Sequence, residues 1–489
     1  MANIDRRTFL RTTTTIAAGA LAPELTLATD NNHRELMASP SPSTPHVTKT
    51  LASYIVSARY EDLPANVRKE GLRTLLNWVG VAVGGSQHET INVAVDALGP
   101  FSGPSQASIL GRRERFDVMN AAFINGVSSH IFDYDDTHLK TIIHPAGPVM
   151  SAILALAEYL PVDGRTFLNA LILGVETECR IGNAVYPDHY DRGLHITGTA
   201  GVFGAAASAG KLLNLSEQQM IWALGLAASQ PVGLRESFGS MNKSFNPGRA
   251  ASDGLFAALL ASKNFTSSDE MIEAKRGWAN TISTKQDYKE ITEGLGERYE
   301  ALLNTYKPFA CGIVMHPAID AAIQLRNQYQ LKPDQIDTIN LRVNPLVLEL
   351  TGKKAPTAGL EGKFSIYHAV AVAMVEGAAG ENQFSDRAVE DPTIVALRSR
   401  VLPVVDPAVK PEQVEMSITL MDGRRLEKSI HHAIGSLEAP MTDHDLETKF
   451  TDLADGILTS AQIQKLIGLC WSAEKLSSAA DIAKAAVPA

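Results

Sequence analysis

Acidic residues and histidines gather in one short stretch of this sequence. Residues 133–138 read Asp-Tyr-Asp-Asp-Thr-His, and His144-Pro145 follows shortly after. Carboxylates next to imidazoles can form an acid/base pair or bind a metal ion. The same stretch can also be a capped, solvated turn at the end of a helix. We take Asp133, Thr137 and His144 as candidate site residues.

Other polar clusters stand directly before Ala- and Gly-rich segments, where a helix start exposes free N–H groups that favour bound anions. Alone, each residue in them could instead be a cap or a surface cation. The candidates in these clusters are His195, Lys243 and Arg249. Two later clusters, Lys307-Pro308-Phe309 followed by His316, and a Lys-Phe-Ser segment, add the candidates His316, Lys363, Tyr367 and His368.

Composition narrows the class of function. The net charge of −10 argues against a nucleic-acid partner, because phosphate binding needs clustered Lys and Arg. It leaves room for a positive pocket that binds an anionic small molecule. The three cysteines match no metal or disulfide pattern and are expected to be buried thiols. A Gly-rich phosphate loop, a dinucleotide fingerprint and a Gly-x-Ser-x-Gly elbow are missing from the sequence, which argues against a nucleotide cofactor and a serine hydrolase.

The start of the sequence resembles an export signal. A consecutive Arg pair, Arg6-Arg7, precedes Phe9-Leu10 and a mildly apolar Thr/Ala stretch. We therefore predict a twin-arginine signal over 1–29 and a periplasmic or exported protein, with a cytoplasmic location as the alternative. Residues 30–46 are rich in Ser and Pro and are expected to be a linker. No membrane-spanning helix is expected.

Hydrophobic spacing predicts a mainly helical chain. Apolar residues recur at helical spacing over 67–84, 121–131, 149–160, 166–181, 199–213 and 218–228. After about residue 306 two segments alternate, 339–343 and 414–420, and Asp422-Gly423 indicates a hairpin. Helices are expected between them at 316–329, 365–377 and 388–399. We predict helical residues 47–305, a smaller α+β domain at 306–440, and a return to the helical domain at 441–489.

Taken together and in chain order, these clusters resemble the MmgE/PrpD family, which includes 2-methylcitrate dehydratase, cis-aconitate decarboxylase and iminodisuccinate epimerase. The resemblance covers about 47–471 and is most specific in the Asp-x-Asp-Asp-Thr-His element. It implies a large all-helical domain from both chain ends with an inserted α+β lid. It also implies a homodimer, no metal or organic cofactor, and a site between the two domains. Its decarboxylase branch places Asp133, Thr137, His144, His195, Lys243 and His316 in the active site.

The chain departs from that branch at two positions. His368 stands where the branch has Tyr, with Tyr367 just before it, and Asn246 stands where the Lys motif often has His. Both changes alter the acid/base groups of the site.

The family activities all move a proton at carbon next to a carboxylate. We predict a lyase acting on a small polycarboxylate, with His144 and His195 as the acid/base pair and Asp133 orienting one imidazole. Lys243, Arg249 and Lys363 are expected to bind carboxylates, together with Thr137 and Tyr367. His316 and His368 are expected to complete the site from the lid.

Three other readings stay open. The first is an epimerase of an amino- or imino-dicarboxylate such as iminodisuccinate. The second is a non-catalytic protein that binds carboxylates. The third is a metal-dependent hydrolase using Asp133, Asp136, His138 and His144.

Overall fold

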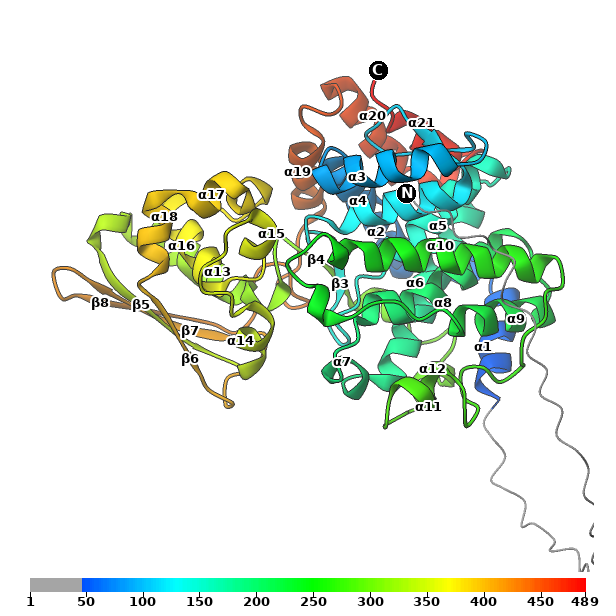
Figure 1. Cartoon of the computed structure of the whole chain (residues 1–489), viewed down its shortest axis with the longest axis horizontal. Helices are drawn as coiled ribbons and strands as arrows, with labels where there is room; N and C mark the ends of the chain where they lie inside the picture. Colours follow the sequence, from blue (N-terminus) through cyan, green and yellow to red (C-terminus); the bar gives the residue numbers. More distant parts are fainter. Residues whose placement is uncertain (1–45) are drawn as a thin grey trace, which may run out of the picture. The chain divides into compact units, whose positions relative to one another are not determined.

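The computed structural model describes residues 46–489, so the predicted export signal and nearly all of the predicted linker lie outside the described residues. Within them the chain is mainly helical, as predicted (Figure 1). The helices up to residue 292 are α1 (Val47–Ser57), α2 (Ala65–Gly85), α3 (Glu89–Leu98), α4 (Val118–His130), α5 (Ala146–Tyr159), α6 (Gly164–Val185), α7 (Asp188–Asp191), α8 (Ile196–Leu212), α9 (Glu217–Ala228), α10 (Asn242–Ser262), α11 (Trp278–Ile282) and α12 (Lys289–Thr292).

Two short antiparallel pairs accompany these helices. β1 (Ala107–Ser108) pairs with β2 (Arg115–Phe116), and β3 (Asp136–His138) pairs with β4 (Asn304–Tyr306). The second pair joins the polar 133–138 stretch to the segment that leads into the α+β region. Because Thr137 stands opposite Thr305 in this register, residues far apart in the sequence are brought beside Asp133.

The α+β region is built around a four-stranded sheet in the order β6-β5-β7-β8. β5 is parallel to β6 and antiparallel to β7, which forms the predicted hairpin with β8. The elements of this region are α13 (His316–Tyr329), β5 (Ile336–Val343), α14 (Pro345–Thr351), α15 (Gly359–Gly362), α16 (Ile366–Glu376), α17 (Asp386–Glu390), α18 (Pro392–Arg398), β6 (Val401–Val405), β7 (Val414–Leu420) and β8 (Arg425–Ile430).

The sequence reading differs from the structure at two places in this region. The helix predicted over 388–399 is divided, because Pro392 has no N–H to continue α17 and the Asp391 side chain caps α18 through the N–H groups of Thr393 and Ile394. β6 was not predicted. It contains Pro403, which the chain tolerates because β6 is an edge strand.

Three helices close the chain: α19 (Asp443–Ala454), α20 (Ser460–Trp471) and α21 (Ala480–Ala485). Phe450 of α19 packs so tightly on α2 that a Cβ at Gly80 would lie 2.9 Å from its ring. One hydrophobic core contains residues from both chain ends, including Leu75 and Phe450, and a second core contains residues 309–433. The domain boundaries at 306 and 440, and the role of the α+β part as a lid, stay predictions.

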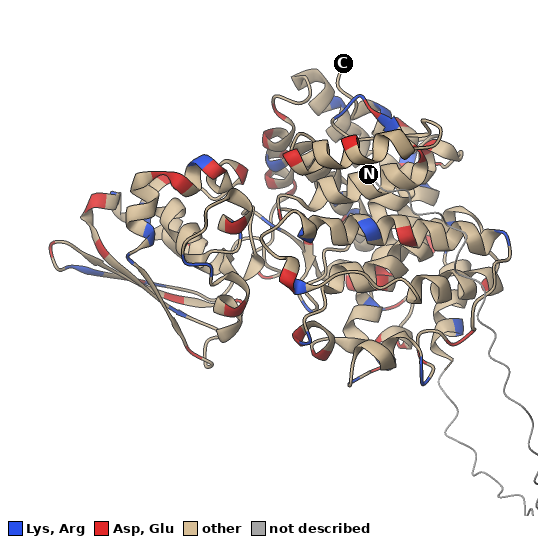
Figure 2. Ribbon diagram, viewed as in Figure 1, with Lys and Arg blue, Asp and Glu red and all other residues tan. Residues whose placement is uncertain are grey.

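Small residues allow the helices that carry the polar clusters to approach closely. A Cβ at Gly126 of α4 would lie 2.6 Å from Gly248 of α10, and a Cβ at Gly254 would lie 2.5 Å from Ala205 of α8. In Figure 2 positive and negative residues lie interspersed on the helices. None of the described helices is long and apolar enough to span a membrane.

Candidate active site

Four helix ends meet around the 133–138 stretch. α4 ends at His130, α5 begins after His144-Pro145, and His195 is the N-cap of α8. α10 begins at Asn242, which places Lys243 in its first turn. These polar residues are therefore fixed by helix ends, where the tight packing of the small residues leaves little freedom.

Asp133 is buried in a left-handed backbone conformation, with φ of 49°. Asp is one of the few side chains that tolerate this region. Its Oδ1 accepts from the ammonium groups of Lys243 at 2.9 Å and Lys307 at 2.7 Å, and its main-chain oxygen accepts from Lys307 at 3.0 Å. The two ammonium groups hold the pKa of Asp133 well below its usual range although burial opposes this. Asp133 is thus the anion that allows two lysines to be buried together.

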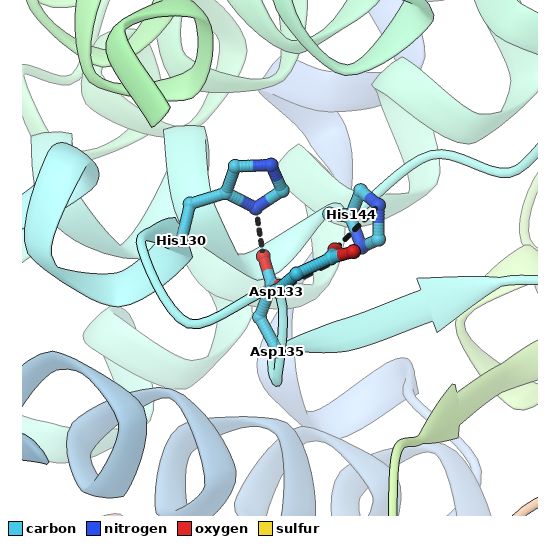
Figure 3. Close-up of side chains that lie close together, drawn as sticks. All are labelled: His130, Asp133, Asp135 and His144. Carbon is cyan, nitrogen blue, oxygen red and sulfur yellow. Dashed lines mark hydrogen bonds and ion pairs between the residues drawn. The ribbon is translucent and has the colours of Figure 1, made fainter. Parts of the chain in front are cut away.

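Lys243 also donates to Nε2 of His130 at 2.7 Å, while Nδ1 of His130 lies 2.6 Å from Asp135 (Figure 3). An ammonium donates three hydrogen bonds. Lys243 uses two of them on His130 and Asp133, and Lys307 uses two on Asp133. Each ammonium therefore keeps one hydrogen for a ligand in the adjacent pocket.

The His144 ring is held on one side only. Its Nδ1 lies 2.8 Å from the Asp136 carbonyl oxygen, which can only accept, so this nitrogen carries the hydrogen. Its Nε2 carries a lone pair and lies 4.0 Å from Asp133, too far for a hydrogen bond. Burial lowers the pKa of His144 well below its ordinary value. Without a ligand and near neutral pH, the His144 imidazole is therefore neutral, and its Nε2 can accept a proton.

A pocket lies beside these groups. Its apolar lining includes Ile142, Phe238, Leu350 and Phe364. Its polar and charged lining consists of Asp133, His144, Tyr190, His195, Lys243, Lys307 and Thr351. Two cations and two imidazoles in a partly apolar wall suit a small anionic molecule.

The structure revises the role predicted for Asp133 and adds residues that the sequence reading missed. Asp133 binds lysines and does not orient an imidazole; the Asp136 carbonyl orients His144, and Asp135 binds His130. The Thr137 side chain lies 3.3 Å from Nδ1 of His144, behind the ring. Lys307 and His130 were not predicted as site residues.

Three predicted residues of the α+β region engage other groups. Lys363 donates to the Ala310 carbonyl at 2.9 Å and pairs with Glu381 at 2.5 Å. Nε2 of His368 lies 2.9 Å from the carbonyl oxygen of Gln383, so the hydrogen bond of this nitrogen is made to the main chain. Tyr367 packs against the second hydrophobic core. None of the three lines the pocket described above. Lys363 instead lines a smaller pocket that shares Asp133, Lys243 and Phe364 with it, whereas Tyr367 and His368 line neither pocket.

His316 is buried close to the pocket without lining it. Its Nε2 lies 3.4 Å from the Cys311 carbonyl and its ring packs edge-on against Phe309. Burial lowers its pKa to about 3, so the ring is neutral at physiological pH.

Arg249 is on the outer side of α10, where it pairs with Asp253 four residues on at 2.8 Å and its side chain is 49% exposed. It does not line the pocket, so this structure gives it no contact with a ligand there. We expect Arg249→Gln to change the free energy of unfolding by less than about 1 kcal/mol, because half-exposed pairs of this kind contribute little. Denaturant unfolding and steady-state kinetics check this. A large rise in KM would return Arg249 to the site.

Four residues, His130, Asp133, Asp135 and His144, offer donor atoms within 4.8 Å of one another, a spacing that a metal ion could use (Figure 3). Both ring nitrogens of His130 already have partners, and two ammonium groups lie on the Asp133 oxygen that a cation would use. In this arrangement the donor set does not fit a metal ion. His138 and Asp136 of the hydrolase alternative contact Thr141, Glu300, Ala146 and Asn304 instead.

Asp136 provides a pH test of the buried network. Burial and the neighbouring Asp135 raise its pKa to about 7. The unfolded carboxyl ionises near pH 4, so its contribution to stability is complete below that pH and is lost as pH rises to about 7. Asp136→Asn mimics the neutral acid. We expect the wild type, relative to this variant, to lose up to about 4 kcal/mol between those limits. Urea unfolding of both proteins across this range measures it, and parallel pH curves would contradict the assignment.

Two models of one protein family match this chain, one over its first part and one over its second. The model of the MmgE/PrpD N-terminal domain matches residues 49–291, and that of the MmgE/PrpD C-terminal domain matches 309–473. A cis-aconitate decarboxylase-like protein of Aspergillus oryzae is 26% identical over 90% of this chain and 97% of its own length. Cis-aconitate decarboxylase of Homo sapiens is 26% identical over 88% and 92%. A 2-methylcitrate dehydratase of Cupriavidus necator is 24% identical over 66% and 72%. The predicted family is thereby confirmed: this chain belongs to the MmgE/PrpD family of enzymes.

Proposed function

We propose that this protein is a lyase that acts on a small tricarboxylate by moving a proton at carbon next to a carboxylate. The observation that carries the proposal is the pair of buried ammonium groups, Lys243 and Lys307, each with one free hydrogen beside the free Nε2 of His144. The cis-aconitate decarboxylase and 2-methylcitrate dehydratase relatives support the substrate class.

In this proposal the two lysines bind the carboxylate on which negative charge builds up. Cations held in place in a dry pocket stabilise that charge more than water does. His144 is the proton carrier, because it gains or loses a proton on Nε2 while Nδ1 stays bonded to the Asp136 carbonyl. A proton carrier held in place contributes about 10²–10⁴-fold to the rate.

Decarboxylation is the finer form of the proposal that we favour. The decarboxylase relatives match 88–90% of the chain, whereas the dehydratases match 62–66%. On cis-aconitate, one C–C bond would break to release carbon dioxide. Its electron pair would shift the double bond, and the proton of a His144 imidazolium would be added to the alkene CH carbon. Dehydration would instead transfer a proton from carbon to His144, while a second acidic group protonates the leaving hydroxyl so that it departs as water.

The experiment that tests the proposal is incubation of the protein in deuterated buffer with cis-aconitate, 2-methylcitrate, citrate or iminodisuccinate, followed by proton NMR, with and without EDTA. Carbon dioxide release with one deuterium in the product indicates decarboxylation. Water loss indicates dehydration, and exchange without net change indicates an epimerase. Activity that EDTA abolishes and an added metal restores would overturn the metal-free site. Binding without turnover would favour the non-catalytic reading.

The direction of the pH profile separates the first two reactions. A dehydratase needs His144 as a base, so its activity falls as pH falls. A decarboxylase needs the imidazolium, so its activity falls as pH rises. Burial lowers the pKa of His144 in the free protein, whereas a bound tricarboxylate raises it.

A further inference from the structure

His195 is held from behind by an amide. Nδ2 of Asn246 lies 2.8 Å from Nδ1 of His195, and both side chains are buried. An amide N–H group can only donate, so Nδ1 of His195 accepts and the ring hydrogen is on Nε2. The main chain fixes the ring further, since the His195 N–H donates to the Gly233 carbonyl at 3.0 Å.

Ser237 determines which way the Asn246 amide points. The Ser237 hydroxyl donates its one hydrogen to the Leu234 carbonyl at 2.7 Å. Its oxygen is then left to accept from Asn246 Nδ2 at 3.3 Å. A rotated amide would place a carbonyl oxygen against this oxygen with no hydrogen between them. Close packing adds to the constraint, because a Cβ at Gly233 would lie 2.9 Å from Cγ of Asn246.

His195 and His144 therefore differ in what they can do with a proton. His144 gains a proton on Nε2 without losing its bond to Asp136. His195 gains one only on Nδ1, which breaks its bond to Asn246. The groups that face His195 mostly oppose a positive charge there: Lys243, Arg235 and the His130 ring disfavour it, and only Asp133 favours it among them.

We infer that Asn246 is a positioning residue that holds His195 neutral with its hydrogen on Nε2, so that His195 donates a hydrogen bond to the reacting carboxylate while His144 carries the proton. The inference rests on the proposed function for the identity of the ligand. It revises the predicted acid/base pair, because one histidine becomes a fixed donor.

The protonation of His195 is testable without any substrate. ¹⁵N NMR of protein labelled at histidine, with the His195 signals assigned by their loss in His195→Gln, should show a bare Nδ1 and a protonated Nε2. Asn246→Asp replaces the donor with a carboxylate that only accepts, so the hydrogen should move to Nδ1. A protonated Nδ1 in the wild type would overturn the inference, whatever the substrate proves to be.

Kinetics give a second readout. Above the new pKa of His195, Asn246→Asp leaves a lone pair facing the substrate, and we expect kcat to fall by about 10²–10³-fold, as when one donor to a developing anion is lost. Below that pKa the imidazolium restores the Nε2 hydrogen, so the kcat of the variant should recover as pH falls, relative to the wild type. KM should change less than kcat. A variant that folds and keeps the wild-type pH profile and kcat would refute the inference.

Ser237→Ala tests the orientation of the amide alone. It frees the Asn246 amide to rotate, so we expect a smaller fall in kcat and a mixture of His195 protonation states. Ser252→Ala is the matched control, because Ser252 of α10 donates to the Arg249 carbonyl on its own helix and is not part of this chain of bonds. Equal behaviour of the two variants would argue that Ser237 has no orienting role.

Discussion

His144→Asn is expected to lower kcat by about 10²–10⁴-fold, the contribution of a well-placed proton carrier. The amide nitrogen of Asn stands where Nδ1 stands in His and can still donate to the Asp136 carbonyl. The variant therefore keeps the hydrogen bond and loses only the Nε2 lone pair. KM should change little, because Lys243 and Lys307 remain in place.

Steady-state kinetics and deuterium incorporation into the product measure this effect, and the pH limb that His144 produces should vanish with it. His138→Asn is the control. His138 belongs to the same stretch but contacts Thr141 and Glu300 and does not line the pocket. Its loss should lower stability and leave kcat of the folded protein near the wild-type value. If His144→Asn kept kcat within tenfold of the wild type, the proton would have to move through another group.

Much of the fold follows from local patterns. α13 spans the predicted residues 316–329, and α2 extends the predicted helix by only a few residues at its ends. The spacing of the apolar residues and the helix-ending residues beside them set these bounds, so a single sequence is enough to predict them. β6 was missed because an edge strand containing Pro403 lacks the alternation and the composition of a buried strand.

The site was predictable where its residues adjoin in sequence. Asp133 and His144 stood out because polar residues crowd one helix end. Lys307 was noted within a polar cluster but not chosen as a site residue, because it is 174 residues from Asp133 and reaches it through the pairing of β3 with β4. Nothing in a Lys-Pro-Phe segment indicates that partner. Arg249 could have been set aside from the sequence, since Asp253 follows at i+4 on the same helix.

The protonation states of the histidines needed the three-dimensional structure. An imidazole has the same composition in any environment, and its role depends on which atom faces each ring nitrogen. A backbone carbonyl faces Nδ1 of His144, and an amide N–H group faces Nδ1 of His195. From the sequence, His144 and His195 were candidate site residues and Asn246 was a departure from the family pattern. The sequence does not show which atom faces each ring nitrogen.

Asp133→Asn is expected to reduce the free energy of unfolding by about 3–5 kcal/mol, the cost of removing one partner from a buried ion cluster. Asn tolerates the left-handed conformation of residue 133, so the loss reports charge and not backbone strain. Without the anion, the ammonium groups of Lys243 and Lys307 repel each other in a buried site. Burial already lowers the pKa of Lys243, and the loss of Asp133 should lower it further. The lysines would then bind the substrate carboxylate poorly, and KM should rise as well.

The double variant Asp133→Asn/Lys307→Met separates charge balance from packing. It removes one cation together with the anion, so it should regain part of the stability that Asp133→Asn loses, while its KM stays above that of the wild type. Urea unfolding of the wild type, Asp133→Asn, Lys307→Met and the double variant gives the coupling energy between the two residues. We expect it to be about 1–3 kcal/mol, as for groups in one ion network. Independent effects of the two substitutions would show that Asp133 does not hold Lys307 in place. The proposal that the two lysines bind carboxylate could then no longer rest on Asp133 as their buried counter-ion.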